Sequence, residues 1–265
     1  MLSICATPIG NLDDVTLRVL TELREAELVL AEDTRHTRIL LERHGLRPKL
    51  LSFHRHNEAS RVAELIPRLL AGARIALVSD AGMPLVSDPG ARLVRAAIDA
   101  GVEVTMLPGP SAVEASLVLS GQADGAYAFV GFLPRRSGEL ASLWRDVVAR
   151  PYPTVAFESP QRLPATLRTL AEIDPGVPVA VCRELTKHFE EVVRGAAGDV
   201  AARFDEAPRG EITLVVGPGG AEPDRDAAQA AVTDLVAAGT PRRVAADVVS
   251  RLTGVARNAL YRDTL

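Results

Sequence analysis

Cysteine is nearly absent from this sequence, since Cys5 and Cys182 are the only two among 265 residues. Two cysteines are too few for a disulfide scaffold, and no CxxC pair is present to bind zinc. No apolar run reaches the roughly 18 residues that a membrane-spanning helix needs. The N-terminal segment has no basic start and turns at Pro8-Ile9-Gly10, which is not the pattern of a signal peptide. We therefore expect a cytoplasmic protein.

Motifs that cradle phosphate groups are missing as well. The sequence has neither GxxxxGK[ST] nor GxGxxG after an expected strand, and the first strand-to-helix turn holds a single glycine, Gly10. Binding of ATP or NAD through such a loop is thereby disfavoured. The net charge of −4 argues against a uniformly basic nucleic-acid-binding protein but allows a local basic surface. With 47% apolar and 24% charged residues, the composition is that of an ordinary globular protein.

The first half of the chain alternates short apolar runs with amphipathic segments. We expect strands at residues 2–6, 28–31, 50–53, 74–79 and 102–107. Helices are expected after Thr16, briefly at 39–41, and at about 61–71 and 91–100. This repetition predicts a mainly parallel α/β sheet. Ligands bind beyond the C-terminal ends of such strands, which is where TPIGN, AEDTR, SFHRHNE, SDAGMP and PGPSA stand.

The second half has a different rhythm that predicts another α/β domain with hairpin elements. Strands are expected at 127–133, 154–158, 177–183, 189–195 and 211–217, with helices at 138–150, 162–172 and 199–207. The stretch from Gly217 to Pro223 is typical of a linker. Beyond it, the pattern predicts three short helices separated by turns at Gly239-Thr240-Pro241 and Gly254.

Several clusters allow two interpretations on their residues alone. Pro8-Ile9-Gly10-Asn11 fits a tight turn as well as a ligand-binding loop. Asp80 fits a helix-capping carboxylate as well as an acceptor for an ammonium or ribose group, while Gly82 lets the main chain come close to a ligand. Asp88-Pro89-Gly90 is expected to be the N-cap and turn into the next helix.

Basic side chains gather in two places. Residues 35–61 hold several arginines and histidines, a segment that suits either a solvated face or a patch for a phosphate-bearing partner. His54 and His56, on a strand or at its exit, would point to opposite faces, which disfavours a shared metal ion. The tail from Gly239 suits either contact with a nucleic-acid backbone or a helical cap or dimer contact. It carries two aspartates and five arginines: Arg242, Arg243, Arg251, Arg257 and Arg262.

Nine motifs in fixed order resemble one family across the whole chain. They read TPIGNLDDVTLR, AEDTRHTRILLERHG, SFHRHNE, LVSDAGMPLVSDPG, LPGPSA, GFLPRR, FESPQRL, CRELTKHFEEVVRG and GEITLVV. The sequence is similar to the small-subunit ribosomal RNA methyltransferases I, which are cytidine 2′-O-methyltransferases of the tetrapyrrole methylase superfamily. Where that family commonly reads SDAGTP and FYESPHR, this chain has Met83 and Gln161.

This resemblance implies two α/β domains with S-adenosylmethionine in the cleft between them, a small helix-turn-helix-like extension at the C-terminus, and a homodimer. The implied boundaries are 1–112, 113–219 and 220–265. The cofactor would be held by backbone loops instead of a Rossmann phosphate turn. Carried over by motif, the cofactor-binding residues are Pro8, Asp80, Gly82, Met83, Ser111, Ala112, Phe157, Glu158, Ile212 and Thr213.

The implied reaction moves a methyl group to a ribose 2′-oxygen, which requires alignment and benefits from a base or a cation near the hydroxyl. Among Glu32, Asp33, His54, Glu58 and Lys187, we expect Lys187 and Glu58 to be catalytic. Lys187 would act as a base if burial lowered its pKa, and as a cation otherwise. No metal is expected. The residues expected to contact the RNA are Arg35, His54, Asn57, Arg135, Arg136 and Arg183.

The expected partner is ribosomal RNA, either naked or within the small ribosomal subunit. One alternative keeps the superfamily and makes a small tetrapyrrole the methyl acceptor, although the arginine-bearing tail disfavours it. A second alternative is a non-catalytic RNA-binding regulator built around a ligand-sensing α/β core.

Overall fold

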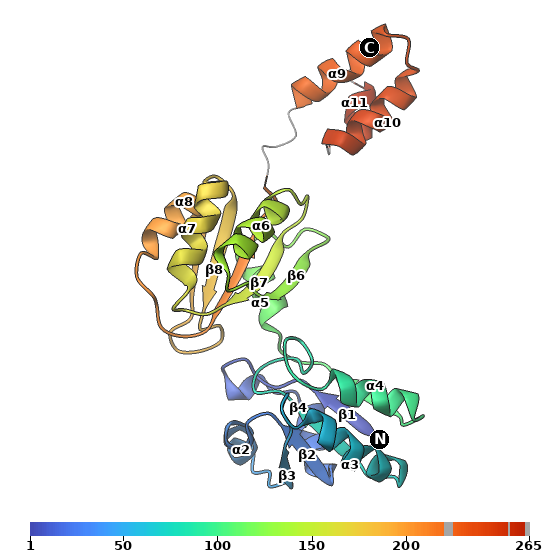
Figure 1. The fold of residues 1–265 in the computed structure, drawn as a ribbon, viewed down its shortest axis with the longest axis vertical. Coiled ribbons are helices and arrows are strands. Elements are labelled where there is room, and N and C mark those ends of the chain that lie inside the picture. Colours follow the sequence, from blue (N-terminus) through green and yellow to red (C-terminus); the bar gives the residue numbers. More distant parts are fainter. Residues whose placement is uncertain (220–224, 254, 263–265) are drawn as a thin grey trace.

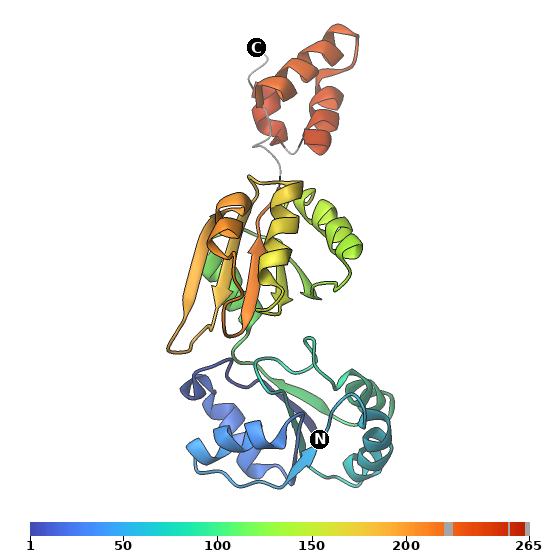
Figure 2. The same cartoon turned by 60° about the vertical axis from the view of Figure 1, so that its left-hand side comes forward.

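The computed structural model describes residues 1–219, 225–253 and 255–262 of the chain. It contains two sheets, each packed with helices, followed by a unit of three helices (Figure 1). The second sheet lies beyond the loops at one edge of the first (Figure 2).

The first sheet is entirely parallel and has the order β3-β2-β4-β1-β5. Its strands are β1 (Leu2–Cys5), β2 (Leu28–Ala31), β3 (Leu50–Ser52), β4 (Ile75–Val78) and β5 (Val104–Leu107). A short 3-10 helix and four α-helices connect them: η1 (Leu12–Asp14), α1 (Leu17–Glu25), α2 (Thr34–Arg43), α3 (Glu58–Leu70) and α4 (Ala91–Asp99).

Both faces of this sheet are covered by helices, so its central strands are buried on both sides. Helix α1 begins where expected, because the Thr16 side chain accepts a hydrogen bond from the backbone N–H of Val19 at 3.2 Å. The short helix expected at 39–41 is part of the longer α2, which begins at Thr34 because Asp33 caps it.

The second sheet has the order β6-β7-β10-β8-β9, with β6 parallel to β7 and the other pairs antiparallel. Its strands are β6 (Ala128–Phe132), β7 (Thr154–Glu158), β8 (Pro178–Arg183), β9 (Glu191–Ala196) and β10 (Ile212–Val216). Its helices are α5 (Ala112–Ser120), α6 (Ser137–Val148), α7 (Leu163–Ile173) and α8 (Ala197–Arg203).

One face of the second sheet forms a core with α6, α7 and α8, centred on Trp144 and Leu167. Helix α5 covers the opposite face, where Val113 and Leu117 pack against Val215. Helix α5 was not expected from the sequence, because the PGPSA motif indicates a turn and the helix starts within its last residues.

The last part of the chain consists of α9 (Arg225–Ala237), α10 (Arg242–Thr253) and α11 (Arg257–Arg262). These helices share a small core of their own that includes Val232, Val249 and Leu260.

Part of the expected linker, residues 220–224, lies outside the described residues. The boundaries 1–112, 113–219 and 220–265 stay a prediction, although the two sheets fall on either side of the first boundary. Of the helices in the described part of the chain, none combines the length and apolar character needed to cross a bilayer.

Candidate functional site

A cavity of about 400 Å³ lies between the two sheets. The first domain lines it with the loop that follows β4, residues 80–88, and with Ile9. The second domain contributes the ends of four neighbouring strands, β6, β7, β10 and β8, together with the start of α5. The cavity therefore lies at the C-terminal edge of the parallel sheet, where the sequence predicted a ligand-binding site.

The charged groups that line this cavity all have the same sign. They are four carboxylates, Asp80, Asp88, Glu158 and Glu211, and the described residues supply no lysine, arginine or histidine to the lining. Glu158 and Glu211 are paired with Arg162 and Lys187, so Asp80 and Asp88 supply most of the negative charge that faces a ligand, and this charge suits a ligand that carries positive charge. Cys182 also lines the cavity, but burial raises the pKa of its thiol to about 11, so it is neutral and unreactive.

The TPIGN loop and the SDAGMP loop are held together by main-chain hydrogen bonds. The N–H of Thr7 donates to Gly82 O at 2.8 Å, and the N–H of Gly82 donates back at 3.1 Å. Gly82 has a φ of +75°, a left-handed conformation that favours glycine, and a Cβ there would make a tight contact of 3.2 Å with Ile9 Cγ2. Pro8 itself is buried beside this pair and lines a smaller neighbouring pocket with Thr7 and Asp80.

The cofactor-binding residues expected in the second domain lie next to one another on paired strands. Ile212 pairs with Glu158 and Thr213 with Phe157 in the antiparallel register of β10 and β7. All four line the cavity, as do Asp80, Gly82 and Met83 from the first domain and Ser111 and Ala112 at the start of α5. Nine of the ten expected residues thus share one cavity, with Pro8 just behind it. Their contact with a cofactor stays a prediction.

Glu158 is fully engaged inside the protein. Its buried carboxylate accepts hydrogen bonds from Thr166 Oγ1 at 2.6 Å and from the N–H of Ser159 at 2.7 Å, and it lies 3.3 Å from Arg162 Nη2. These contacts fix the end of β7 against α7. The position of Glu158 in the cavity wall is therefore rigid.

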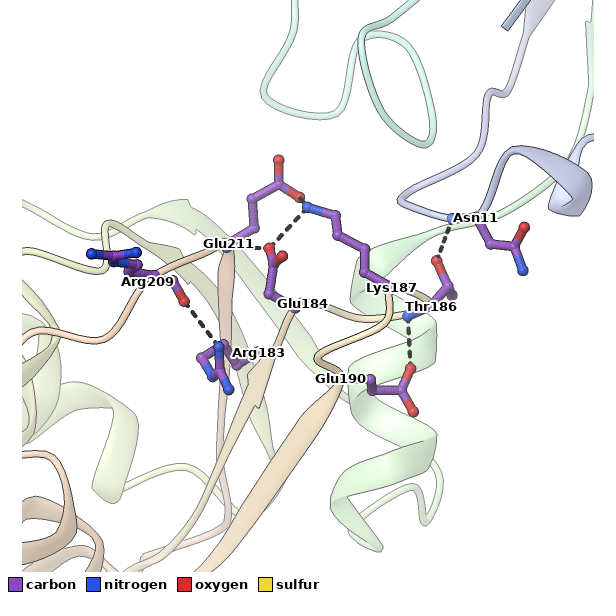
Figure 3. A network of polar contacts seen from close by, with 8 residues as sticks. All are labelled: Asn11, Arg183, Glu184, Thr186, Lys187, Glu190, Arg209 and Glu211. Carbon is purple, nitrogen blue, oxygen red and sulfur yellow. Dashed lines mark hydrogen bonds and ion pairs between the residues drawn. The ribbon is translucent and has the colours of Figure 1, made fainter. Parts of the chain in front are cut away.

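Lys187 stands between two carboxylates beside the cavity (Figure 3). Its Nζ lies 2.9 Å from Glu184 Oε1 and 3.0 Å from Glu211 Oε2. Partial burial disfavours the charged ammonium, but the hydrogen bonds to Glu184 and Glu211 outweigh it and raise the pKa of Lys187. Of the two roles open to Lys187 from the sequence, the structure favours the cation over the base.

The loop that carries Lys187 contacts the first domain at Gly10. A Cβ at Gly10 would lie 2.5 Å from Lys187 Cγ and 2.7 Å from the carbonyl oxygen of Leu185. Beside it, the N–H of Asn11 donates to Thr186 Oγ1 at 2.9 Å (Figure 3). The TPIGN motif therefore forms part of the contact between the two domains.

Glu58 lies outside the cavity lining and caps a helix. Its buried carboxylate accepts hydrogen bonds from the N–H groups of Gly90 at 3.1 Å and Arg92 at 3.3 Å, at the start of α4. Asp88-Pro89-Gly90 holds the N-cap and the turn into α4, as expected, but the side chain of Asp88 does not cap the helix. The N-cap residue is Gly90, which has no side chain, and Glu58 on α3 supplies the missing acceptor.

The residues expected to contact RNA occupy different places. Asn57 holds the loop after β3, since its side chain accepts from the N–H of His54 at 2.9 Å and donates to Ser52 O at 3.1 Å. Arg35 is exposed and pairs with Asp33 at 2.7 Å.

Arg135 and Arg136 are exposed before α6, whereas Arg183 pairs with Glu191 at 3.0 Å. In the tail, Arg257 pairs with Asp247 at 2.6 Å. The side chain of Arg262 lies outside the described residues. The structure therefore does not unite the six residues expected to contact RNA in one site, and their roles stay predictions.

Other carboxylates lie close together at the end of the first sheet. Burial, followed by the charges of Glu32 and Asp80, raises the pKa of Asp88 to about 6. Burial and the charge of Asp80 likewise raise the pKa of Glu32. Asp88 and Glu211 both line the cavity and were not among the expected site residues. The signal that was available for Asp88 is its position in the same strand-end loop as Asp80.

Comparison with known proteins places this geometry in a family. Residues 1–201 match the tetrapyrrole (corrin/porphyrin) methylases. A protein from Mesorhizobium japonicum named ribosomal RNA small subunit methyltransferase I is 43% identical over 100% of this chain and 91% of its own length. Proteins of the same name from Neisseria meningitidis serogroup A and Thermotoga maritima are 39% and 43% identical over 98% and 81% of this chain, and 91% and 97% of their own lengths.

Solved structures with the same fold are more distant in sequence. The methyltransferase CobJ has a TM-score of 0.63 at 19% identity, with 82% of this chain and 93% of that chain covered. Uroporphyrin-III C-methyltransferase from Thermus thermophilus, complexed with S-adenosylhomocysteine, has a TM-score of 0.57 at 19% identity and covers 82% of this chain and 96% of its own. The two-domain α/β fold expected from the sequence is thereby confirmed, and the chain belongs to the tetrapyrrole methylase family.

Proposed function

We propose that this protein transfers a methyl group from S-adenosylmethionine to small-subunit ribosomal RNA, at the ribose 2′-oxygen of a cytidine. The observation that carries the proposal is identity of 38–43% along nearly the whole chain to proteins named ribosomal RNA small subunit methyltransferase I. The acidic cavity between the two domains supports it, because the proposed donor is a cation and contains no phosphate.

The residues that fit the donor lie on the two opposite walls of this cavity. Asp80 and the main chain at Gly82 and Met83 face it from one side, and Ile212 and Thr213 face it from the other. When bound, the donor supplies an activated methyl group on a sulfonium that leaves as a neutral thioether. The protein's contribution is to hold this group in line with the acceptor oxygen and to exclude water.

Lys187 and Glu58 belong to different parts of this proposal. We assign Lys187 to the contact with the substrate as a permanent cation, since its raised pKa keeps it protonated. Glu58 acts at a distance, because its hydrogen bonds fix the start of α4 and with it the loop at 82–90. Replacing either residue with alanine is expected to lower turnover far more than affinity for the donor.

The RNA would bind through positive side chains outside the cavity, including Arg135 and Arg136 before α6 and Arg243 and Arg251 on α10. Because phosphate contacts release counterions, we expect affinity for RNA to fall steeply with salt concentration.

A homodimer is part of the proposal too. It is supported by exposed apolar side chains around α5, where Val118 and Tyr127 line a second groove. Sedimentation equilibrium of the purified protein tests the dimer.

The function is tested by incubating the protein with tritium-labelled S-adenosylmethionine and small ribosomal subunits, with naked RNA and a tetrapyrrole as parallel acceptors. We expect label in the RNA, at a nucleotide whose 3′ phosphodiester bond resists alkaline cleavage, because that cleavage needs a free 2′-hydroxyl. Label in the tetrapyrrole alone would support a small-molecule methyltransferase. Donor binding without transfer to any acceptor would support a ligand-sensing regulator.

A further inference from the structure

The four carboxylates of the cavity differ in what they already bind. Asp80 accepts a hydrogen bond from the N–H of Asp33 at 3.0 Å, and Glu158 and Glu211 are engaged with the partners described above. Asp88 is half-buried in the cavity wall, and none of the described residues gives its carboxylate a hydrogen bond or an ion pair. Among the four acids of this wall, Asp88 is the one for which the described residues engage neither carboxylate oxygen, whereas Asp80 and Glu211 each have one oxygen engaged.

The loop that carries Asp88 is fixed by contacts that leave this side chain free. Leu85 and Ser87 have φ angles of 70° and 71°, a region that costs a non-glycine residue about 1–2 kcal/mol and persists only where the surroundings impose it. Arg55 Nη2 donates to Ser87 O at 2.8 Å, and Glu58 occupies the start of α4 just beyond. Asp88 is thus presented to the cavity by a strained but well-held loop.

The charges around Asp88 suit a group that accepts a proton near neutral pH. Glu32 and Asp80 face it from the ends of β2 and β4 and raise its pKa, while Arg55 from the loop after β3 lowers it. Across the cavity, Glu158 and Glu211 are held by Arg162 and Lys187. The pKa of about 6 leaves Asp88 mostly ionised at pH 7 and still basic enough to take a proton from a hydroxyl in the transition state.

We propose that Asp88 is the general base of the methyl transfer. This inference rests on the proposed function. The Asp88 carboxylate takes the proton of the ribose 2′-hydroxyl as the bond from O2′ to the methyl carbon forms. The bond from that carbon to sulfur breaks, and its electron pair stays on sulfur, which becomes a neutral thioether. Asp88 then returns the proton to water.

Asp88→Asn keeps the shape of the side chain and removes its ability to take the proton. We expect single-turnover methyl transfer to small subunits to slow by about 100-fold or more, the usual contribution of a general base. Affinity for S-adenosylhomocysteine, measured by titration calorimetry, should stay within about twofold, which also shows that the variant folds. Asp146→Asn is the matched control, because Asp146 is exposed on α6 and outside the cavity.

The pH dependence separates a base from a residue that only shapes the loop. In the wild-type protein the rate should fall as the pH is lowered through about 6, the pKa of Asp88. Asp88→Asn should lose this fall. Glu32→Gln should move it to lower pH, because removing the Glu32 charge lowers the pKa of Asp88.

Asp88→Asn at near-wild-type rate, or slow but with the wild-type pH profile, would overturn the inference. So would a Glu32→Gln profile that does not move. These results concern Asp88 only if the wild-type protein labels the RNA. Absence of label with the wild-type protein would instead refute the proposed function itself.

Discussion

The two walls of the cavity are built in opposite ways. The first domain offers a loop beyond parallel strands, where Asp80 and Asp88 stand close to other carboxylates and the pKa of Asp88 is raised. The second domain offers residues on paired antiparallel strands, where Glu158 is buried under three partners and Glu211 is tied to Lys187.

This difference separates carboxylates that can react with a ligand from carboxylates that hold the fold in place. A carboxylate with all its acceptor positions satisfied contributes to stability but has little left to offer a substrate. A carboxylate without partners costs stability and is available for chemistry, as is usual at functional sites. We therefore expect substitutions in the second wall to act mainly on folding and substitutions in the first wall to act mainly on ligand and rate.

The largest effect is expected from Glu158→Ala. Removing this carboxylate leaves Thr166 Oγ1 and the N–H of Ser159 without their acceptor and takes the counter-charge from Arg162, which keeps only the carbonyl oxygens of Leu133 and Pro134; this should lower the free energy of unfolding by about 3 kcal/mol. The shift of the urea midpoint measures it. Glu139→Ala is the control, since Glu139 makes an exposed pair with Arg136 and its loss should cost less than about 0.5 kcal/mol. Equal shifts for the two variants would remove the distinction between the walls.

The contact between the walls is tested by Gly10→Ala. The added Cβ meets Leu185 O and Lys187 Cγ at less than normal contact distance, so the loop at 184–187 must move away. We expect affinity for S-adenosylhomocysteine to fall by about tenfold or more, from an overpacking cost of about 1–3 kcal/mol. Gly138→Ala is matched, because nothing lies within 4 Å of a Cβ there. Unchanged calorimetric affinity in Gly10→Ala would show that donor binding does not depend on this contact.

In the first wall, Asp80→Ala should weaken binding of S-adenosylhomocysteine by about tenfold, roughly the 1.4 kcal/mol of one hydrogen bond to a charged group. The variant loses a carboxylate of the cavity and the acceptor for the N–H of Asp33. Titration calorimetry measures the change. An affinity equal to that of the wild type would exclude Asp80 from the donor site.

The smallest effect has the opposite sign. The pKa of Asp88 is raised to about 6 from an ordinary 3.8, so the folded protein binds this proton more tightly than the unfolded chain does. Ionised Asp88 therefore costs stability above pH 6, and the cost disappears as the pH falls toward 4. Because the side chain is partly exposed, we expect Asp88→Asn to stabilise the protein by only about 1 kcal/mol at pH 8.

Urea unfolding of Asp88→Asn at pH 8 and pH 4 checks this, and the gain should be absent at the lower pH. Destabilisation at pH 8 would mean that Asp88 has a partner in the folded protein. The first wall would then lack the unpaired carboxylate, Asp88, that distinguishes it from the second wall.

Much of the fold could be predicted because local patterns carry it. Apolar runs of four to seven residues predicted the strands of both sheets, and Thr16 marked the start of α1. Helix α5 was missed, since its start is hidden by the turn residues before it. Nine of the ten expected cofactor-binding residues line one cavity. The expected loops and strand ends come together there because strands that are neighbours in a sheet end side by side at its edge.

The roles of individual carboxylates could not be predicted in the same way. Asp88 and Glu58 have comparable surroundings in the sequence, each next to the start of a helix. The structure gives the helix cap to Glu58, which is 32 residues from Gly90, and leaves Asp88 free. A local pattern holds no information about a partner that far along the chain.

The alternation of strands and helices, the polar loops at the strand ends and the lack of a phosphate-binding turn all follow from the order of the residues. Hydrophobic periodicity and turn residues act over a few neighbouring positions, so they can be recognised in the sequence alone. Three properties arise from folding alone: which acids are paired, the protonation of Lys187, and the contact of Gly10 with the second domain. These properties depend on distances of about 3 Å between groups far apart in the chain, and such distances exist only after folding.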